Sequence, residues 1–445
     1  MKPSNFNLTI ELDNHKSVLI NTLTGAMDIL PNETIDYLQD GLCNTNDEVA
    51  EYLYQRQYLL DADLDEAQLV QDLYGELLKH QRKITPLRGV IILTFDCNLR
   101  CKYCWQQYKV DEKNKLKLTR DKVDNIFISM EHLYSSLENK SEQPPIIQLF
   151  GGEPLLPENK EIIAYSLHKC SEKKWYAQIT TNGVFLNDYM RIFEEFPVNE
   201  IQVTIDGPYE VHDRRRIGSK YEELMDSIGR LLQVNRIHTK LRVNVDTANI
   251  DTLPELANDI IKRQWYTNRK FYAYIAPLRD SSLEEPKLIL ERSHLLQKLM
   301  VLKERYPQIE IFDMLGWNGY QAVRVLENTG KMPYPRVNIC DTNMNQFVFT
   351  PKGEIHVCAE EAHDPAGIVG YYWPEYVLNE SSFLGWYNRS PLQLSNCKGC
   401  ALLPVCGGGC QLFIKNRDFY GPYCQAVRDS LIGGIKNYMK QEKLV

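Results

Sequence analysis

Short apolar runs alternate along the chain with longer segments in which apolar residues recur at helical spacing. Between residues 85 and 300, the runs of strand length are Val90–Thr94, Ile146–Phe150, Ala177–Thr180, Ile201–Ile205, Leu241–Val245 and Phe271–Ile275. The helical segments between them are Thr119–Leu137, Lys160–Lys173, Tyr189–Glu195, Tyr221–Asn235 and Thr252–Arg263. This alternation predicts an α/β fold with a parallel sheet and right-handed crossovers. Six such units fit a partial (β/α)6 TIM-like barrel, with active residues at the carboxyl ends of the strands.

A different pattern occupies residues 1–82. Phe6–Leu12 and Lys16–Ile20 are expected to form two short strands around a turn. Three helices are expected after them, and the residues that can cap these helices are Asn32, Thr45 with Glu48, and Asp63 with Glu66. Two strands and three helices make up the inventory of a small winged-helix-like domain. A packing appendage without a binding role fits the pattern equally well.

Length and composition limit the class of protein. The 445 residues suffice for about three domains, and the hydrophobic fraction of 43% can fill a sizeable core. The net charge of −8 gives no general attraction to nucleic acid or to an anionic membrane. No apolar run has membrane-spanning length and the amino terminus lacks the apolar core of a signal peptide, so a cytoplasmic location is expected.

Ten of the 12 cysteines fall into two groups, which in a reducing cytosol more often bind metal than form disulfides. The first group, Cys97-x3-Cys101-x2-Cys104, begins three residues beyond the first predicted strand. Three cysteines so close together can hold three irons of a [4Fe–4S] cube and leave the fourth iron open to a small molecule. Cys43 and Cys170 belong to neither group and are expected to be ordinary buried thiols.

The ends of the other predicted strands carry glycine or polar side chains. The second strand ends in Gly151-Gly152-Glu153, where the glycines allow close approach of backbone and the carboxylate can bind an ammonium group. Later strand ends carry the segments 180–183, 204–208 and 242–246. Each segment alone also fits a turn, but five strand ends that meet at one mouth predict a binding site.

The cysteine triplet, with Tyr103 before its last cysteine, and the Gly-Gly-Glu-Pro segment at 151–154 resemble the radical S-adenosylmethionine (radical SAM) superfamily over residues 88–280. The resemblance implies that SAM chelates the open iron and that one electron cleaves it to methionine and a 5′-deoxyadenosyl radical, which takes hydrogen from a strong C–H bond. It makes Cys97, Cys101 and Cys104 catalytic. The residues for which it implies contacts with SAM are Tyr103, Gly151, Gly152, Glu153, Asn182, Thr204, Arg215 and Arg242.

The second cysteine group reads Cys340-x12-Gly353-x4-Cys358, Cys397-x2-Cys400-x5-Cys406-x3-Cys410 and Cys424. This pattern resembles the SPASM extension of radical SAM enzymes, in which two auxiliary [4Fe–4S] clusters take interleaved ligands. The resemblance implies a complete cluster held by Cys397, Cys400, Cys406 and Cys424, and a second one held by Cys340, Cys358 and Cys410. The second cluster then has either an open iron or a non-cysteine ligand. Zinc is the alternative, but seven cysteines do not make two complete four-cysteine zinc sites.

Two reactions dominate this class: maturation of ribosomally made precursor peptides and anaerobic sulfatase maturation, in which Cys or Ser becomes formylglycine. In sulfatase maturases an Asp follows the cysteine that corresponds to Cys358, and it acts as the base. Here that residue is Ala359, with Glu360 and Glu361 beyond it, which counts against sulfatase maturation.

Residues 1–82 resemble the recognition element of enzymes that mature ribosomally synthesised and post-translationally modified peptides (RiPPs). That element binds a leader peptide as an added strand. The chain is therefore expected to be an oxidoreductase-type peptide maturase with three [4Fe–4S] clusters and SAM, forming a thioether or a C–C or C–O crosslink. A flavodoxin or ferredoxin is expected as electron donor. The non-catalytic alternatives are a multi-cluster electron carrier and a zinc-stabilised interaction protein.

The predicted domains follow from these assignments. They are a recognition domain at 1–82, a radical SAM core at 83–300, a bridging region at 301–339 and a SPASM domain at 340–445.

Overall fold

The computed structural model describes residues 1–40, 48–104, 106, 116–137, 141–278, 287–314, 318–414 and 420–442. Cys43, Thr45 and the predicted helix end near Gly41 lie outside the described residues. None of the described helices is both long and apolar enough to cross a membrane.

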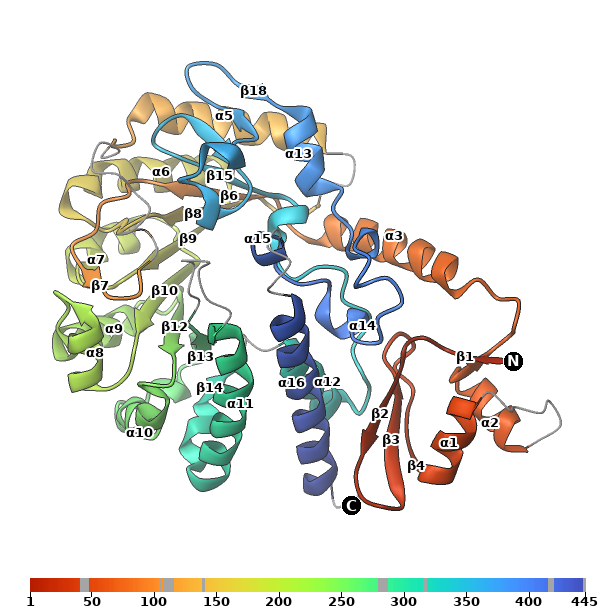
Figure 1. Ribbon diagram of the computed structural model, residues 1–445. Coiled ribbons are helices and arrows are strands. Elements are labelled where there is room, and N and C mark those ends of the chain that lie inside the picture. Colours follow the sequence, from red (N-terminus) through yellow and green to blue (C-terminus); the bar gives the residue numbers. More distant parts are fainter. Residues whose placement is uncertain are drawn as a thin grey trace.

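A sheet of parallel strands forms the centre of the molecule (Figure 1). In the order in which they pair, its strands are β6 (Arg88–Ile92), β8 (Ile146–Phe150), β9 (Tyr176–Thr181), β10 (Glu200–Ile205), β12 (His238–Val245) and β13 (Phe271–Pro277). The crossover helices are α5 (Arg120–Ser136), α6 (Lys160–Lys173), α7 (Leu186–Glu195), α9 (Tyr221–Gln233) and α10 (Leu253–Lys262). All six predicted strands are present and pair in chain order, so the predicted α/β class is confirmed.

The two faces of this sheet differ in polarity because strand side chains alternate between faces. Ile147, Ile179 and Val203 are buried under the crossover helices. Gln148 and Gln178, which are neighbours in register, are half-buried on the other face. The concave side of the core is thus polar, unlike the apolar interior of a closed barrel.

Two further strands extend the parallel set. β14 (Phe312–Asp313) pairs with β13, and β15 (Gln346–Phe349) pairs with β6. From β15 the chain continues through β16 (Glu354–His356), β17 (Gly370–Tyr371) and β18 (Val377–Leu378), all antiparallel. The hairpin turn at Gly353 has a φ of 95°, a backbone conformation that favours glycine. Residues 346–378 therefore belong to the same sheet as the core.

The amino-terminal module contains a three-stranded antiparallel sheet and three helices. Its elements are β2 (Asn7–Glu11), β3 (Lys16–Asn21), β4 (Met27–Pro31), α1 (Asn32–Asp40), α2 (Glu48–Gln55) and α3 (Glu66–Ile84), with β1 (Lys2–Pro3) paired to β5 (Leu59–Leu60). The sequence analysis missed β4. The cap of α3 is Asp65, whose side chain accepts a hydrogen bond from Gln68 N, rather than Asp63.

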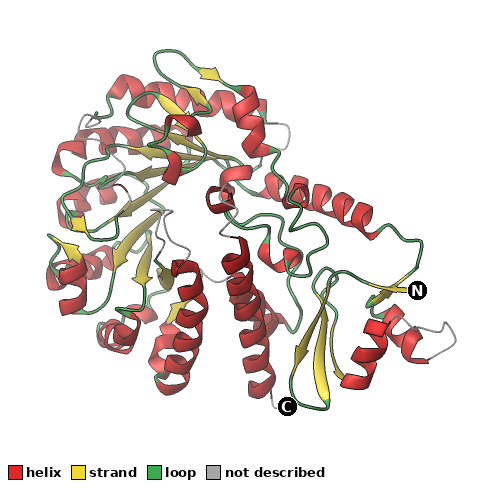
Figure 2. Ribbon diagram, viewed as in Figure 1, coloured by secondary structure: helices red, strands yellow, loops and turns green. Residues whose placement is uncertain are grey.

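One face of this small sheet packs against the carboxyl-terminal helices α12 (Asn318–Thr329) and α16 (Tyr420–Gln441), close to the position of the C-terminus in Figure 2. The strand residues in that apolar cluster are Leu8, Ile10, Val18 and Ile20. Thr22 Oγ1 also donates to Ala401 O at 2.5 Å. The module is therefore an integral part of the folded body.

The remaining elements surround the cysteine groups. They are the short strand pair β7 (Arg100–Cys101) and β11 (Arg216–Ile217), and the helices α8 (Tyr209–Arg215), α11 (Lys287–Arg305), α13 (Glu380–Tyr387), α14 (Leu403–Cys406) and α15 (Gln411–Ile414).

Candidate active site

The first cysteine group occupies the loop that follows β6, at the carboxyl end of the sheet (Figure 1). Burial raises the pKa of Cys97 to about 11, and the nearby Glu153, Cys101 and Cys104 add to the shift. Cys97 Sγ accepts hydrogen bonds from Leu99 N at 3.4 Å and Asn182 Nδ2 at 3.7 Å. Cys97, Cys101 and Cys104 stand in this one loop, and three thiols are chemically a donor set that fits three irons of a [4Fe–4S] cluster.

The glycines of the Gly-Gly-Glu segment bring it against the cysteine loop. Gly152 N donates to Thr94 O at 2.9 Å, and Glu153 N donates to Asp96 O at 2.8 Å. A Cβ on Gly151 would lie 2.3 Å from Thr94 O, and one on Gly152 would lie 2.2 Å from Asp96 O. No side chain fits these spaces, so the two glycines let the end of β8 pair with the loop that carries the cysteines.

The carboxylate of Glu153 is buried and fully engaged by protein donors. It accepts hydrogen bonds from Thr181 Oγ1 at 2.5 Å, Leu155 N at 2.8 Å and Asn182 N at 2.7 Å. Burial raises the pKa of this carboxyl, and the three donors oppose that shift. Glu153 therefore joins the ends of β8 and β9, and its contact with SAM stays a prediction.

A buried network of polar side chains surrounds Tyr103, which lies within the cysteine triplet segment. The Tyr103 hydroxyl donates to Asp206 Oδ2 at 2.5 Å and accepts from Arg216 Nη1 at 2.6 Å and Asn244 Nδ2 at 3.2 Å. Arg216 pairs in register with Cys101 across the β7–β11 ladder. The network thus ties the cysteine loop to the ends of β10 and β12.

Asp206 and Asn244 stood in the predicted strand-end segments 204–208 and 242–246, but the sequence did not reveal that both contact Tyr103. The signal that could have found Asp206 was its place directly after β10, at the edge where the strand ends meet. The pairing of Arg216 with Cys101 and its hydrogen bond to Tyr103 left no local signal, because both partners are far away in the sequence.

Arg215 and Arg242, two of the residues predicted to contact SAM, lie in different surroundings. Both outer nitrogens of Arg215 donate to Asp246, at 3.2 and 2.9 Å, and its guanidinium carbon lies 5.4 Å from the centre of the Tyr103 ring. Arg242 is in register with Thr204 and donates to Asn244 Oδ1 at 2.9 Å. Arg242 and Thr204 are thus neighbours, whereas Arg215 is held by an acidic residue of the protein.

Burial raises the pKa values of several thiols in the second cysteine group. Burial and the neighbouring thiolates of Cys400, Cys406 and Cys424 raise the pKa of Cys397 to about 12. Cys358 has its pKa raised to about 12, chiefly by burial and also by Cys410. The assignment of these cysteines to two interleaved ligand sets stays a prediction.

Cys340, the remaining predicted ligand of this group, is exposed, and its sulfur lies 3.0 Å from Thr342 Oγ1. Among the residues that the structure describes, no three His, Cys, Asp or Glu side chains are gathered tightly enough to enclose a single metal ion. The membership of Cys340 in the second set stays a prediction.

A matching family model gives the class of the protein. Residues 91–260, which contain the cysteine triplet, match the model of the radical SAM superfamily. The chain is a radical SAM enzyme, and SAM and a [4Fe–4S] cluster are its cofactors. The two non-catalytic alternatives are therefore set aside.

Curated relatives include proteins with different reactions. Fe-coproporphyrin III synthase of Methanosarcina barkeri is 24% identical over 351 residues, which is 71% of this chain and 81% of that protein. A cysteine-type anaerobic sulfatase-maturating enzyme of Clostridium novyi is 23% identical over 336 residues, 71% of this chain and 85% of that protein. The GTP 3′,8-cyclase of Clostridium perfringens is 29% identical over 185 residues, and the chain spans about half of its length (53%).

Solved structures share the fold over most of the chain. SuiB of Streptococcus suis bound to S-adenosylmethionine matches with a TM-score of 0.52 and 15% identity, covering 94% of this chain and 97% of that one. The structure of anSMEcpe with bound AdoMet matches with a TM-score of 0.54 and 17% identity, covering 79% of this chain and 100% of that one. The likeness to SuiB thus extends over more of the chain.

The stability of this site is expected to depend on pH through His212. His212 is fully buried, with Nε2 2.9 Å from Ser219 Oγ and Nδ1 accepting from Asp206 N at 3.4 Å. Burial and the charge of Arg216 lower its pKa to about 3. Between about pH 6.5 and about pH 3, His212 is protonated in the unfolded chain but stays neutral in the folded one. The free energy of unfolding therefore decreases as the pH falls through this range, by about 1.4 kcal/mol per pH unit.

Urea unfolding of the anaerobic holoenzyme at pH values between 7.5 and 5 checks this expectation. His212→Gln should lose the extra slope below pH 6.5, whereas His238→Gln, at an exposed position, should keep it. Equal slopes for wild type and His212→Gln would refute the assignment.

Proposed function

We propose that the chain is a radical SAM peptide maturase that removes a hydrogen atom from a ribosomally made precursor peptide. The observation that carries the proposal is the amino-terminal module, a three-stranded sheet built into the folded body beside the second cysteine group. SuiB, whose structure has been solved with its precursor peptide SuiA, shares the fold over 94% of this chain. The likeness to anSMEcpe with its bound Cp18Cys peptide covers 80%.

Three [4Fe–4S] clusters belong to this proposal. Cys97, Cys101 and Cys104 would hold the first cluster, which would supply the electron for reductive cleavage of SAM. Asn182 orients Cys97 through its side-chain amide, and the Tyr103 network fixes the rest of the loop. The auxiliary clusters take Cys397, Cys400, Cys406 and Cys424 in one set, and Cys340, Cys358 and Cys410 in the other.

The polar concave face of the core is a surface suited to a peptide substrate. Gln148 Nε2 donates to Thr180 Oγ1 at 3.0 Å, and Gln202 Oε1 accepts from the Tyr274 hydroxyl at 2.7 Å. The half-buried amides of Gln148 and Gln202 are chemically able to hydrogen-bond the main-chain amides of an extended peptide. A thioether or a C–C or C–O crosslink is the product class proposed for that substrate.

The leader peptide is proposed to add to an outer strand of the small sheet, β2 or β4. Deletion of residues 1–82 does not test this role, because it would expose the apolar residues of α12 and α16 that the sheet covers. Substitutions that keep the module folded are required instead.

Sulfatase maturation is the second candidate, favoured by the likeness to the Clostridium novyi enzyme. Ala359 stands where a sulfatase maturase has its base, and the buried Glu361 follows within the same turn, with its backbone N–H donating to Cys358 O at 3.2 Å. A carboxylate is therefore present close to Cys358, two residues later than the resemblance requires.

Mass spectrometry of two substrates separates the candidates. The reconstituted enzyme is given dithionite and SAM with either a precursor peptide encoded beside its gene or a sulfatase-derived Cys peptide. The proposal expects crosslinking of the precursor, seen as a loss of hydrogen, and no change in the sulfatase peptide. Formylglycine in the sulfatase peptide, with an unmodified precursor, would reverse the assignment.

A further inference from the structure

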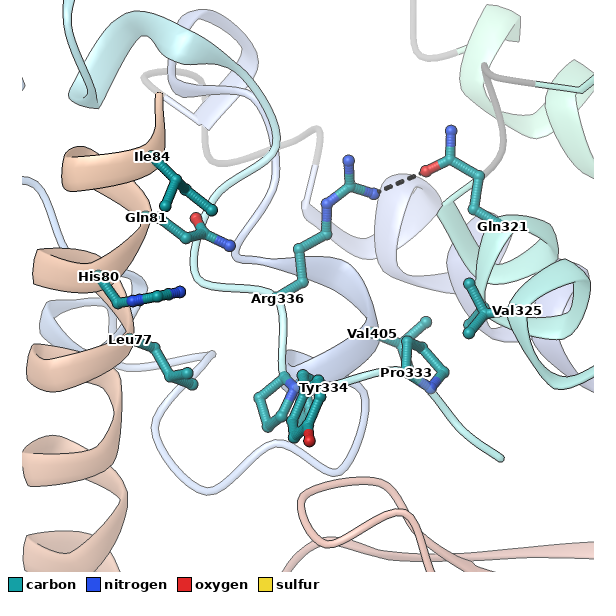
Figure 3. A pocket seen from close by; sticks show the side chains of 13 residues that line it. Leu77, His80, Gln81, Ile84, Gln321, Val325, Pro333, Tyr334, Arg336 and Val405 are labelled. Carbon is teal, nitrogen blue, oxygen red and sulfur yellow. Dashed lines mark hydrogen bonds between the residues drawn. The ribbon is translucent and has the colours of Figure 1, made fainter. Parts of the chain in front are cut away.

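A pocket of about 590 Å³ lies between the amino-terminal module and the second cysteine group, outside the radical SAM core. Figure 3 shows side chains of α3 on one side of it and side chains of α12 on the other, with Arg336 between them. Its apolar walls include Leu77, Ile84, Val325, Tyr334 and Val405. The volume suits one or two large side chains of a ligand.

The apolar wall is unusually open to solvent for residues of this kind. Tyr334 is 90% exposed, Ile84 is 51% exposed and Val325 is 38% exposed. These three come from three different segments and converge on one hollow. Converging exposed apolar side chains are typical of a binding surface rather than of isolated surface residues.

The polar side of the pocket carries a positive charge and no negative one. The guanidinium of Arg336 donates to two neutral oxygens, Asn338 O and Gln321 Oε1, both at 3.0 Å. None of the residues that line the pocket is acidic, and among the described residues no carboxylate forms an ion pair with Arg336. A half-buried cation without a carboxylate partner favours a ligand that brings one.

The pocket is joined directly to the cysteine-rich loop. Arg336 N donates to Pro404 O at 2.7 Å, and a Cβ on Gly407 would touch Arg336 Cγ at 3.1 Å. Val405 of the pocket wall precedes Cys406. A chain seated in the pocket would therefore run beside the predicted auxiliary clusters and between them and the amino-terminal module.

We propose that this pocket binds an acidic, apolar segment of the precursor peptide, with a large apolar side chain between α3 and α12 and an Asp or Glu carboxylate paired with Arg336. The proposal rests on the proposed peptide-maturase function and adds a second contact to the leader-binding strand. The pocket then holds the segment of the precursor between its leader and the part that reacts.

Fluorescence anisotropy with three labelled octapeptides tests the proposal. The peptides alternate leucine with glutamate, glutamine or lysine, and the protein is the anaerobic holoenzyme. The glutamate peptide is expected to bind about tenfold more tightly than the lysine peptide. Val325→Trp, which fills the pocket, and Tyr334→Ala, which removes its outer wall, are each expected to weaken binding of the glutamate peptide about tenfold. Tyr371→Ala, an exposed tyrosine outside the pocket, is the matched control and should leave binding unchanged.

Arg336→Gln separates recognition of the peptide from a role beside the clusters. It is expected to bind the glutamate and glutamine peptides equally, with the wild-type absorbance of the iron–sulfur clusters. Equal binding of all three peptides by the wild type, no binding of any, or wild-type affinity in Val325→Trp would each overturn the proposal. Modification of the precursor is measured in the same variants. Wild-type turnover and KM in Val325→Trp would refute the role of the pocket alone. Failure of the unaltered enzyme to modify any precursor would refute the proposed function.

Discussion

Cys97→Ala is expected to reduce the release of 5′-deoxyadenosine from SAM to the uncatalysed background. The substitution removes one of three neighbouring thiols and leaves the side-chain amide of Asn182 without its sulfur acceptor. A cluster held by two cysteines is not retained, so bound iron should fall by about four per chain from the expected twelve or so. Iron analysis and chromatography of the reaction products measure both quantities.

Cys170→Ala is the matched control, because Cys170 is fully buried but belongs to neither cysteine group. This variant is expected to keep both its iron and its SAM cleavage, with some loss of stability from the smaller side chain. Full iron and full 5′-deoxyadenosine release in Cys97→Ala would contradict the assignment of the triplet.

Asp206→Ala is expected to destabilise the folded enzyme by about 3–5 kcal/mol, because it leaves the buried guanidinium of Arg216 without its carboxylate partner. Asp206 is completely buried, accepts a hydrogen bond from the Tyr103 hydroxyl at 2.5 Å and lies 3.6 and 3.8 Å from the guanidinium groups of Arg215 and Arg216. Its loss should also loosen the cysteine loop, because Tyr103 belongs to it. Chemical denaturation of the holoenzyme gives the stability, and equilibrium dialysis with SAM gives the affinity.

Glu210→Ala provides the comparison, since Glu210 is an exposed carboxylate four residues farther along the chain. It is expected to change the free energy of unfolding by less than about 0.5 kcal/mol. If the Asp206→Ala enzyme is as stable as the Glu210→Ala enzyme, the Tyr103 network does not stabilise the cysteine loop.

The core strands were predictable from sequence because each is a compact apolar run of strand length between helical segments. β4 was not predicted because Met27–Pro31 is short and shows no clear alternation of apolar and polar residues. It also ends in proline, a poor strand residue. The parallel pairing of β15 with β6 could not be predicted from the sequence either. The hairpin around Gly353 was visible in the sequence, but nothing local indicated that its first strand would join residues 88–91.

The candidate site divides in the same way. Both cysteine groups could be recognised in the sequence because metal ligands held by short loops leave a local pattern, and their assignment to clusters stays a prediction. The Tyr103 network joins residues from β7, β10, β11 and β12, and such contacts depend on the folded sheet. The structure also gives Glu153 three protein donors, a role that the Gly-Gly-Glu-Pro pattern alone does not reveal.

Transfer of hydrogen from the precursor to the nucleoside tests the central claim most directly. The anaerobic enzyme is given SAM, dithionite and a precursor peptide in which the carbon-bound hydrogens are replaced by deuterium. The account predicts that 5′-deoxyadenosine gains one deuterium from the peptide and that the peptide becomes crosslinked. Release of 5′-deoxyadenosine that contains no deuterium, with an unchanged peptide, would contradict it.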